Sequence, residues 1–291
     1  MESAIGAASA PAPSRMRRLV QRPLVRIGLA LLATTVPSFL AITAAKHLAQ
    51  EHPPRILPGV AGALTAWLAY CVYVRLVEQR RVAELSASRA LPEAAAGLVL
   101  GAAMVAVVVG VLALFGAYEF TGANRFESRF AVAFVQMVFV GVFEEILFRG
   151  IVFRITQDWL GSWAALAVSA LVFGLAHIPG GAGLQATVIT VVAGAFFAAA
   201  YVLTRRLWLC IGIHIGWNYT LGFVFSIAVS GHPSQGLLDG RLVGPEWLTG
   251  GNYGLEASWI TLALLLGLAL AFARQAAARG HVVPWRGRGA N

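Results

Sequence analysis

Two adjacent carboxylates, Glu144 and Glu145, stand in a strongly apolar part of the chain, within Gly141–Gly150. A charged side chain at the middle of a membrane helix costs about 2.5–3.5 kcal/mol on insertion scales, so such groups are candidates for function. Arg149 follows Glu145 by four residues, which places both on one helical face in the favourable order for an ion pair. Glu144 lies about 140° away from Arg149 around the helix. We therefore interpret Glu145 and Arg149 as a structural ion pair, and Glu144 as a carboxylate free to act as a general base or acid.

The alternative is that both glutamates simply end a span at the membrane surface. Residues 151–153 are Ile, Val and Phe and continue the apolar run beyond them, which disfavours that interpretation.

A second polar group is the sequence Phe173-Gly-Leu-Ala-His177, followed by Pro179 and two glycines that end the helix. Phe173 and His177 share a helical face, so the ring is expected to pack beside the imidazole and limit its rotamers. A lone histidine at a helix end is more often structural. His177 is a candidate for a functional site because the chain has other polar groups within apolar spans that could act with it.

The third group is His214-Ile-Gly-Trp-Asn218, in which His214 and Asn218 again share one face. Gly212 and Gly216 make this helix thin, so that a neighbouring helix or a substrate backbone can approach it closely. A hydrogen bond between helices is the default role for an isolated asparagine. Together with His214, Asn218 suggests part of a pocket.

The elements that carry these groups are membrane helices. Of the 291 residues, 58% are hydrophobic and only 12% are charged, against about 45–50% and 25% in soluble domains. Apolar runs long enough to span a bilayer recur about eight times. They lie near residues 26–45, 56–77, 95–118, 130–152, 163–177, 184–203, 207–230 and 257–274. Among thirteen acidic residues and six histidines, only the two glutamates, His177 and His214 fall inside these runs.

The formal net charge of +9 is distributed by side of the membrane, which excludes a nucleic-acid-binding face. With eight spans, one side carries Arg15, Arg17, Arg18, Arg22, Arg26, Arg75, Arg80, Arg81, Arg89, Arg149, Arg154, Arg205, Arg206, Arg274, Arg279, Arg286 and Arg288. The positive-inside rule then predicts that both termini lie in the cytoplasm. We expect the protein to be integral to a prokaryotic plasma membrane. We expect a basic, disordered tail (1–25), a helical membrane domain (26–274) and a basic tail (275–291), with residues 75–93 as a connector or amphipathic surface helix.

A common site requires the three polar groups to lie at similar depths in the membrane, and His177 is the group for which this is hardest. The run Trp163–His177 is only about 21 Å long as a helix, which is too short to cross the bilayer. The polar groups therefore meet only if a polar cavity near mid-membrane surrounds His177.

The three motifs, in this order on successive spans, resemble the CPBP family, also called the CAAX protease and bacteriocin-processing or Abi family. The motifs are Glu-Glu-x-x-x-Arg at 144–149, Phe-x-x-x-His at 173–177 and His-x-x-x-Asn at 214–218. The resemblance covers about residues 130–230. It implies an eight-span, all-α intramembrane endopeptidase with a mid-membrane polar cavity, acting on a membrane-associated protein, such as a C-terminally anchored or lipidated one.

By the same resemblance, Glu144 would activate the hydrolytic water and His177 would bind or polarise it. His214 and Asn218 would stabilise the tetrahedral oxyanion, while Glu145 and Arg149 would form the structural ion pair. These are the ordinary roles of a base and of aimed hydrogen-bond donors.

Metal dependence stays open from the sequence. His177, His214 and Glu144 are a plausible zinc set with one position left for water. A metal-free, glutamate-type mechanism is favoured because Glu144 cannot easily be both ligand and base, and because Asn218 is a poor zinc ligand.

Two other functions remain as alternatives. A non-catalytic scaffold or bacteriocin-immunity protein could keep the same fold and bind a partner. A transporter using the acidic pair as a proton relay is less favoured, because the chain shows no internal repeat and no second acidic helix.

Overall fold

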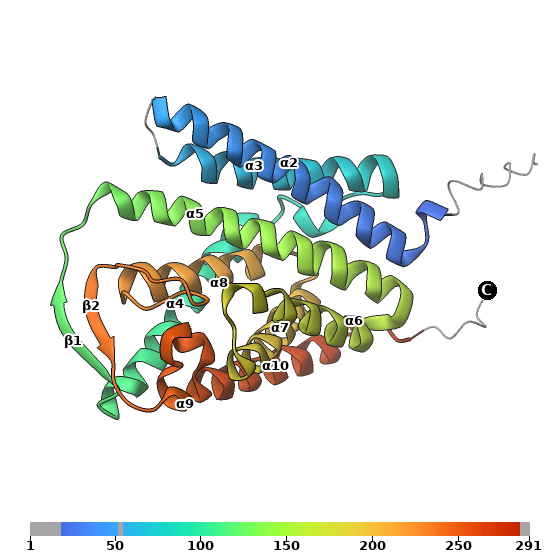
Figure 1. Ribbon diagram of the computed structural model, residues 1–291. Coiled ribbons are helices and arrows are strands. Elements are labelled where there is room, and N and C mark those ends of the chain that lie inside the picture. Colours follow the sequence, from blue (N-terminus) through green and yellow to red (C-terminus); the bar gives the residue numbers. More distant parts are fainter. Residues whose placement is uncertain (1–18, 52–54, 286–291) are drawn as a thin grey trace, which may run out of the picture.

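The computed structural model describes residues 19–51 and 55–285 (Figure 1). Its eight longest helices follow one another along the described chain. They are α2 (Pro23–Glu51), α3 (Leu57–Tyr73), α4 (Ala90–Leu114), α5 (Ser128–Glu145), α6 (Arg154–Ala176), α7 (Leu184–Thr204), α8 (Trp208–Tyr219) and α10 (Trp259–Ala278). The prediction of an all-α polytopic membrane protein with about eight helices is confirmed.

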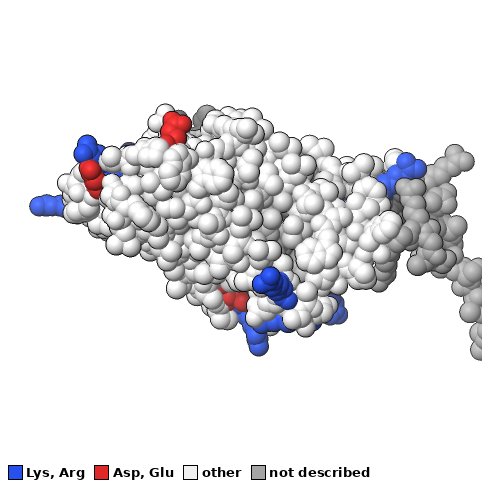
Figure 2. Space-filling model, turned by 90° about the horizontal axis from the view of Figure 1, so that it is seen from below, with Lys and Arg blue, Asp and Glu red and all other residues white. Residues whose placement is uncertain are grey.

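The surface of the bundle is that of a protein embedded in lipid. Six stretches of the described chain are long and apolar enough to cross a bilayer, and the longest, Ser128–Gly180, contains both α5 and α6. Side chains such as Leu32, Leu40 and Val99 are more than 60% exposed. Figure 2 shows a face on which charged side chains lie near the ends and one edge, with a broad uncharged surface between them. The chain is therefore an integral membrane protein.

The predicted tails fall largely outside the described residues. Residues 1–18 and 286–291 are not described, so the predicted N-terminal disorder and the positions of Arg15, Arg17, Arg18, Arg286 and Arg288 stay predictions. Helix α2 begins at Pro23, close to the predicted start of the membrane domain. The other predicted domain limits remain untested.

Helix α5 lies between the α2–α3 pair and the other helices (Figure 1). Helix α3 packs on one side of α5, and α8 packs on the other. Behind α8 lies α4, and α7 packs against both α6 and α10. The acidic pair at the end of α5 is therefore covered by neighbouring helices, with Glu145 buried and Glu144 partly buried.

Irregular turns separate several predicted spans. Helix α5 ends at Glu145, and the chain continues as the π-helix η3 (Ile146–Phe153) before α6. The predicted fifth span, 163–177, is the later part of α6, which starts at Arg154 and is interrupted at Gly161 (φ 81°). Only glycine fits there readily, because of the positive φ and because an added Cβ would lie 2.8 Å from the backbone nitrogen of Trp285.

The predicted seventh span, 207–230, is too long. Helix α8 ends at Tyr219, and the π-helix η5 (Thr220–Val224) closes it. Residues 225–230 belong instead to the loop that follows. Apolar composition does not indicate where this helix ends, because Val229 and its apolar neighbours belong to a loop that packs against the protein.

The connector after α3 also differs from the prediction. It contains a π-turn, η1 (Val74–Glu78), and a short 3-10 turn, η2 (Ala83–Leu85), rather than a surface helix. Burial alone would raise the pKa of Glu84, but hydrogen bonds and the charge of Arg80 hold that pKa below its ordinary value. Arg154, at the start of α6, donates to Glu78 over 2.7 Å. Ion pairs thus attach the connector to the end of η3, and a free amphipathic helix does not form.

Glycines bring α4 and α8 into backbone contact. Gly97 and Gly101 lie on the face of α4 that meets α8. Gly212 and Gly216 lie on the opposing face of α8, and a Cβ at any of the four would overlap a carbonyl oxygen of the other helix. The close neighbour expected at Gly212 and Gly216 is therefore α4. This contact fixes the helix that carries His214 and Asn218.

The long segment between α8 and α10 is also tightly packed. Its strand β2 (Leu238–Leu242) pairs antiparallel with β1 (Tyr118–Ala123), and the short helix α9 (Glu246–Thr249) follows. The backbone N–H of Gly231 donates to the Tyr253 carbonyl over 3.1 Å. Gly254 (φ 93°) lies so close to the Ala228 carbonyl oxygen that a side chain would not fit. Residues 228–231 and 253–257 thus form one rigid unit.

Candidate active site

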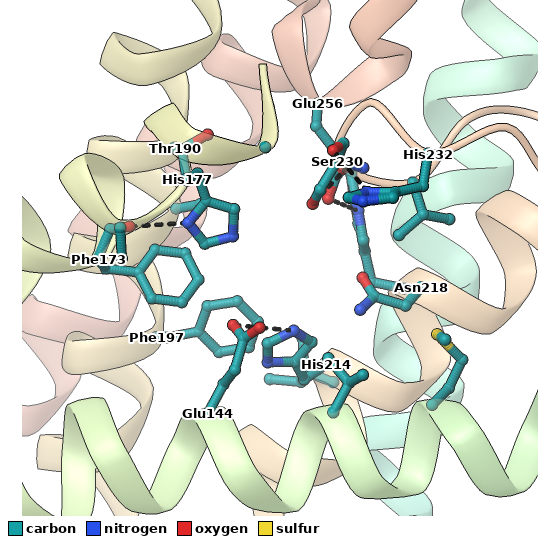
Figure 3. A pocket seen from close by; sticks show the side chains of 18 of the residues that line it. Glu144, Phe173, His177, Thr190, Phe197, His214, Asn218, Ser230, His232 and Glu256 are labelled. Atoms are coloured by element: carbon teal, nitrogen blue, oxygen red, sulfur yellow. Dashed lines mark hydrogen bonds and ion pairs between the residues drawn. The ribbon is translucent and has the colours of Figure 1, made fainter. Parts of the chain in front are cut away.

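A cavity of about 590 Å³ lies among α4, α5, α6, α7, α8 and α10. Glu144, His177, His214 and Asn218 all line it, and Figure 3 shows their side chains directed into one space. His177 is the C-cap residue of α6. Although His177 stands at the end of a short helical segment, it therefore lines the same cavity as the other three groups.

The two adjacent glutamates have different environments. Glu145 is fully buried, and its Oε1 lies 3.0 Å from Nη1 of the equally buried Arg149. The Glu144 side chain is 24% exposed, and its Oε2 lies 3.8 Å from Nε2 of His214 without any hydrogen-bond partner. A carboxylate oxygen without a donor, directed into a cavity, is available to a ligand or to water.

Arg149 is held by more than its ion pair. Its Nη2 donates to the Gly194 carbonyl of α7 over 3.1 Å. The guanidinium lies 4.5 Å from the ring centroid of Phe173 and 4.8 Å from that of Phe197. Such cation–π contacts stabilise a desolvated guanidinium by about 2 kcal/mol each. Arg149 therefore ties η3, α6 and α7 together behind the cavity wall.

Phe173 links this buried arginine to the histidines. Its ring centroid lies 4.7 Å from that of His177, and its carbonyl accepts a hydrogen bond from Nδ1 of His177 over 2.8 Å. A carbonyl oxygen can only accept, so Nδ1 carries the proton and Nε2 is left for the cavity. Both contacts limit the rotation of the imidazole.

Sequence reasoning missed that Glu145 also holds His214. Nδ1 of His214 lies 2.9 Å from Oε1 of Glu145, the same oxygen that meets Arg149. The carboxylate accepts, so Nδ1 of His214 donates and its Nε2 faces Glu144. Helical spacing pairs Glu145 with Arg149 along one helix, but it carries no information about a partner on α8.

Asn218 lines the cavity one helical turn beyond His214 and is 6% exposed. Its side-chain amide makes no hydrogen bond with any other residue in the described part of the chain. An amide held at a cavity wall with its donors unused can bind an oxygen atom of a ligand.

The structure adds a second carboxylate, that of Glu256, to the cavity. Its Oε2 accepts from the backbone N–H of Ser230 and, over 3.2 Å, from that residue's hydroxyl; Oε1 accepts from Nε1 of Trp217 over 3.3 Å. Burial raises the pKa of this carboxyl, and the bonds from Ser230 act in the opposite direction. Glu256 lies in a polar loop, so no sequence signal distinguishes it from a solvated residue.

His232 also lines the cavity, although the sequence suggested an ordinary loop histidine. Its Nδ1 faces the Ser230 carbonyl oxygen at 3.1 Å. Its ring is exposed, so it stands at the accessible edge of the cavity.

Metal dependence stays a prediction. Among residues 19–51 and 55–285, no group of three or more His, Cys, Asp or Glu side chains is placed to hold a metal ion. Of the predicted zinc ligands, Glu144 and His214 lie 3.8 Å apart, and His177 lines the same cavity.

Comparison with known proteins now bears on this geometry. Residues 126–220 match a family model described as type II CAAX prenyl endopeptidase Rce1-like. This segment of the chain is similar to the CAAX protease family. The match contains all three motifs and confirms the resemblance found for residues 130–230. No curated protein and no solved structure matches the chain.

This match supports, in general terms, an intramembrane protease of the CAAX type whose substrate is a membrane-associated protein. The segment 225–258, which supplies Ser230, His232 and Glu256, lies beyond the family match.

Proposed function

We propose that this protein is an intramembrane endopeptidase in which Glu144 activates water to hydrolyse a peptide bond of a membrane-associated protein, such as a C-terminally anchored or lipid-modified one. The observation that carries the proposal is the Glu144 carboxylate. It has an oxygen without a hydrogen-bond partner, in a cavity that also contains two oriented histidines and a free amide. The family match supports the reaction class.

In the proposed reaction, water lies between Glu144 and Nε2 of His177. Glu144 takes a proton from the water, and the water oxygen attacks the carbonyl carbon of the scissile bond. The C–N bond then breaks, and Glu144 returns that proton to the leaving amine. His177 is suited to hold the water because its Nδ1 is committed to the Phe173 carbonyl, which leaves Nε2 as the acceptor.

Asn218 and His214 stabilise the oxyanion that develops on the carbonyl oxygen. Asn218 can donate from its unused amide. His214 already donates from Nδ1 to Glu145, so it serves as a donor from Nε2 only as a doubly protonated imidazolium. Glu145 is thus a positioning residue in this scheme, besides forming the ion pair with Arg149.

The scheme needs no metal ion, since a carboxylate base and hydrogen-bond donors are sufficient for water activation. Metal analysis of the purified protein, with cleavage measured before and after chelation, tests this. Loss of cleavage on chelation and its return with zinc would instead favour a metal-dependent mechanism.

The decisive experiment uses the full chain reconstituted in lipid vesicles with a defined mixture of synthetic peptides, each anchored by an N-terminal acyl chain. Mass spectrometry identifies new peptide ends. We expect cleavage by the wild type and a loss of at least about 10³-fold in Glu144→Gln and 10²-fold in His177→Ala, as for general acid–base groups.

The matched controls are Glu127→Gln and His47→Ala, which change exposed residues outside the cavity and should cleave like the wild type. If Glu144→Gln and His177→Ala both retain cleavage, the proposed roles are wrong. If the wild type cleaves none of the peptides and both variants keep cellular function at normal abundance, the scaffold or immunity alternative replaces the protease.

A further inference from the structure

The cavity combines two carboxylates with no permanently cationic side chain. Glu144 and Glu256 line it, and none of its described lining residues is Lys or Arg. The nearest part of Arg149 is separated from it by the rings of Phe173 and Phe197. Figure 3 shows Glu256 and Ser230 across the open space from Glu144. A ligand that fills the cavity therefore meets a carboxylate at each of two opposite walls.

Three histidines that line the cavity add further hydrogen-bond acceptors to the two carboxylates. His177, His214 and His232 each turn Nδ1 toward an oxygen that accepts, namely the Phe173 carbonyl, Glu145 and the Ser230 carbonyl. Each ring in its neutral form therefore presents Nε2 as an acceptor. The cavity is rich in groups that bind donors and cations.

Glu256 is held in place with acceptor capacity left over. Oε2 is fixed by the two bonds from Ser230, while Oε1 has only the bond of 3.3 Å from Trp217. The rigid contact between residues 228–231 and 253–257 sets its position. A carboxylate oxygen accepts more than one hydrogen bond, so Oε1 can also bind a donor from a ligand.

An independent observation also indicates a ligand near this wall. Thr261 of α10 lines the cavity, is only 1% exposed, and its hydroxyl has no hydrogen-bond partner. Buried hydroxyls nearly always have a partner, and an unused one at a cavity wall is explained if a bound molecule supplies it.

We propose that Glu256 is a specificity-determining residue, and that the cavity takes a substrate segment bearing a Lys or Arg side chain near the scissile bond. The cation binds Oε1 of Glu256 while the scissile carbonyl faces Glu144. This inference rests on the proposed protease function.

The test uses the full chain in lipid vesicles and one acyl-anchored peptide that it cleaves. Variants of the peptide carry Lys or norleucine at each of the three positions on either side of the cleaved bond. We expect the wild type to favour Lys at one position by at least tenfold in kcat/KM. Added salt should weaken this preference.

Glu256→Gln should reduce the ratio of kcat/KM for the Lys peptide to that for the norleucine peptide to less than about threefold. Glu256→Asp, which keeps the charge, should retain part of the preference. Glu246→Gln, an exposed change in the same loop, should keep it all. A structural role for Glu256 in anchoring Ser230 would instead lower cleavage of all peptides equally, which would overturn the inference.

Equal cleavage of Lys and norleucine peptides by the wild type would also overturn the inference, even if Glu256→Gln does not fold. Failure of the proposed function looks different. In that case the wild type cleaves no peptide, or Glu144→Gln cleaves as well as the wild type.

Discussion

At the scale of single residues, the adjacent glutamates have different roles: Glu145 stabilises the structure, and Glu144 is available for reaction. One oxygen of Glu145 meets both Arg149 and His214, and all three side chains are buried. Removing one member of a buried ion pair leaves an uncompensated charge, which typically costs about 3–5 kcal/mol. Glu144 has no such partner, so we expect it to contribute to catalysis rather than to the free energy of unfolding.

We therefore expect Glu145→Gln to lower the free energy of unfolding by about 3–5 kcal/mol, and Glu144→Gln to change it much less. Thermal unfolding of both variants in one detergent measures the difference. The double variant Glu145→Leu/Arg149→Met should recover most of the stability, because no buried charge is left unpaired. It should not recover cleavage, because His214 loses its acceptor; a stable Glu145→Gln protein would contradict this account.

At the scale of elements, the site depends on how close helices can approach. The contact of α4 with α8 is set by four glycines that leave no room for a Cβ. Because His214 and Asn218 both lie on α8, any displacement of this helix moves two groups of the site together. Misplacement of catalytic groups by about 1 Å can cost about 100-fold in rate.

Gly216→Ala should therefore destabilise the protein by about 1–3 kcal/mol through overpacking and lower cleavage by at least tenfold. Gly110→Ala in α4 is the matched control, since nothing lies within 4 Å of an added Cβ there. It should be neutral or slightly stabilising. If Gly216→Ala unfolds at the same temperature and cleaves normally, close packing of α4 and α8 does not position the site.

At the scale of the whole molecule, the chain reverses direction from one long helix to the next, and α2 begins at the end of the bundle where α10 finishes (Figure 1). Most arginines of the described residues belong to that end. We propose that this end faces the cytoplasm, as the positive-inside rule predicts for a prokaryotic plasma membrane.

Single-cysteine variants expressed in bacterial cells test this orientation. Ser88→Cys lies in the connector before α4, and Thr121→Cys lies in β1 at the opposite end. A membrane-impermeant maleimide should label Thr121→Cys in intact cells and Ser88→Cys only after permeabilisation. The unchanged protein is the control for Cys71 and Cys210, neither of which is exposed. The reverse pattern would invert the proposed topology.

The amino-acid sequence by itself determined the membrane class, the number of long helices and the family segment, because hydrophobic length and helical spacing are local properties. Spacing also separated Glu144 from Glu145, since residues four apart share a helical face and residues five apart do not. Local signals misjudged the later parts of the chain. The start of α6, the end of α8 and the connector after α3 all depend on contacts with distant residues, such as that of Arg154 with Glu78.

Only the tertiary structure decided that the four polar groups line one cavity, that Glu145 holds His214, and that Glu256 enters the site from a loop. The physical reason is the same in each case. The partners come from helices and loops far apart in sequence, and their distances are set by the packing of whole elements, including the glycine contact of α4 with α8.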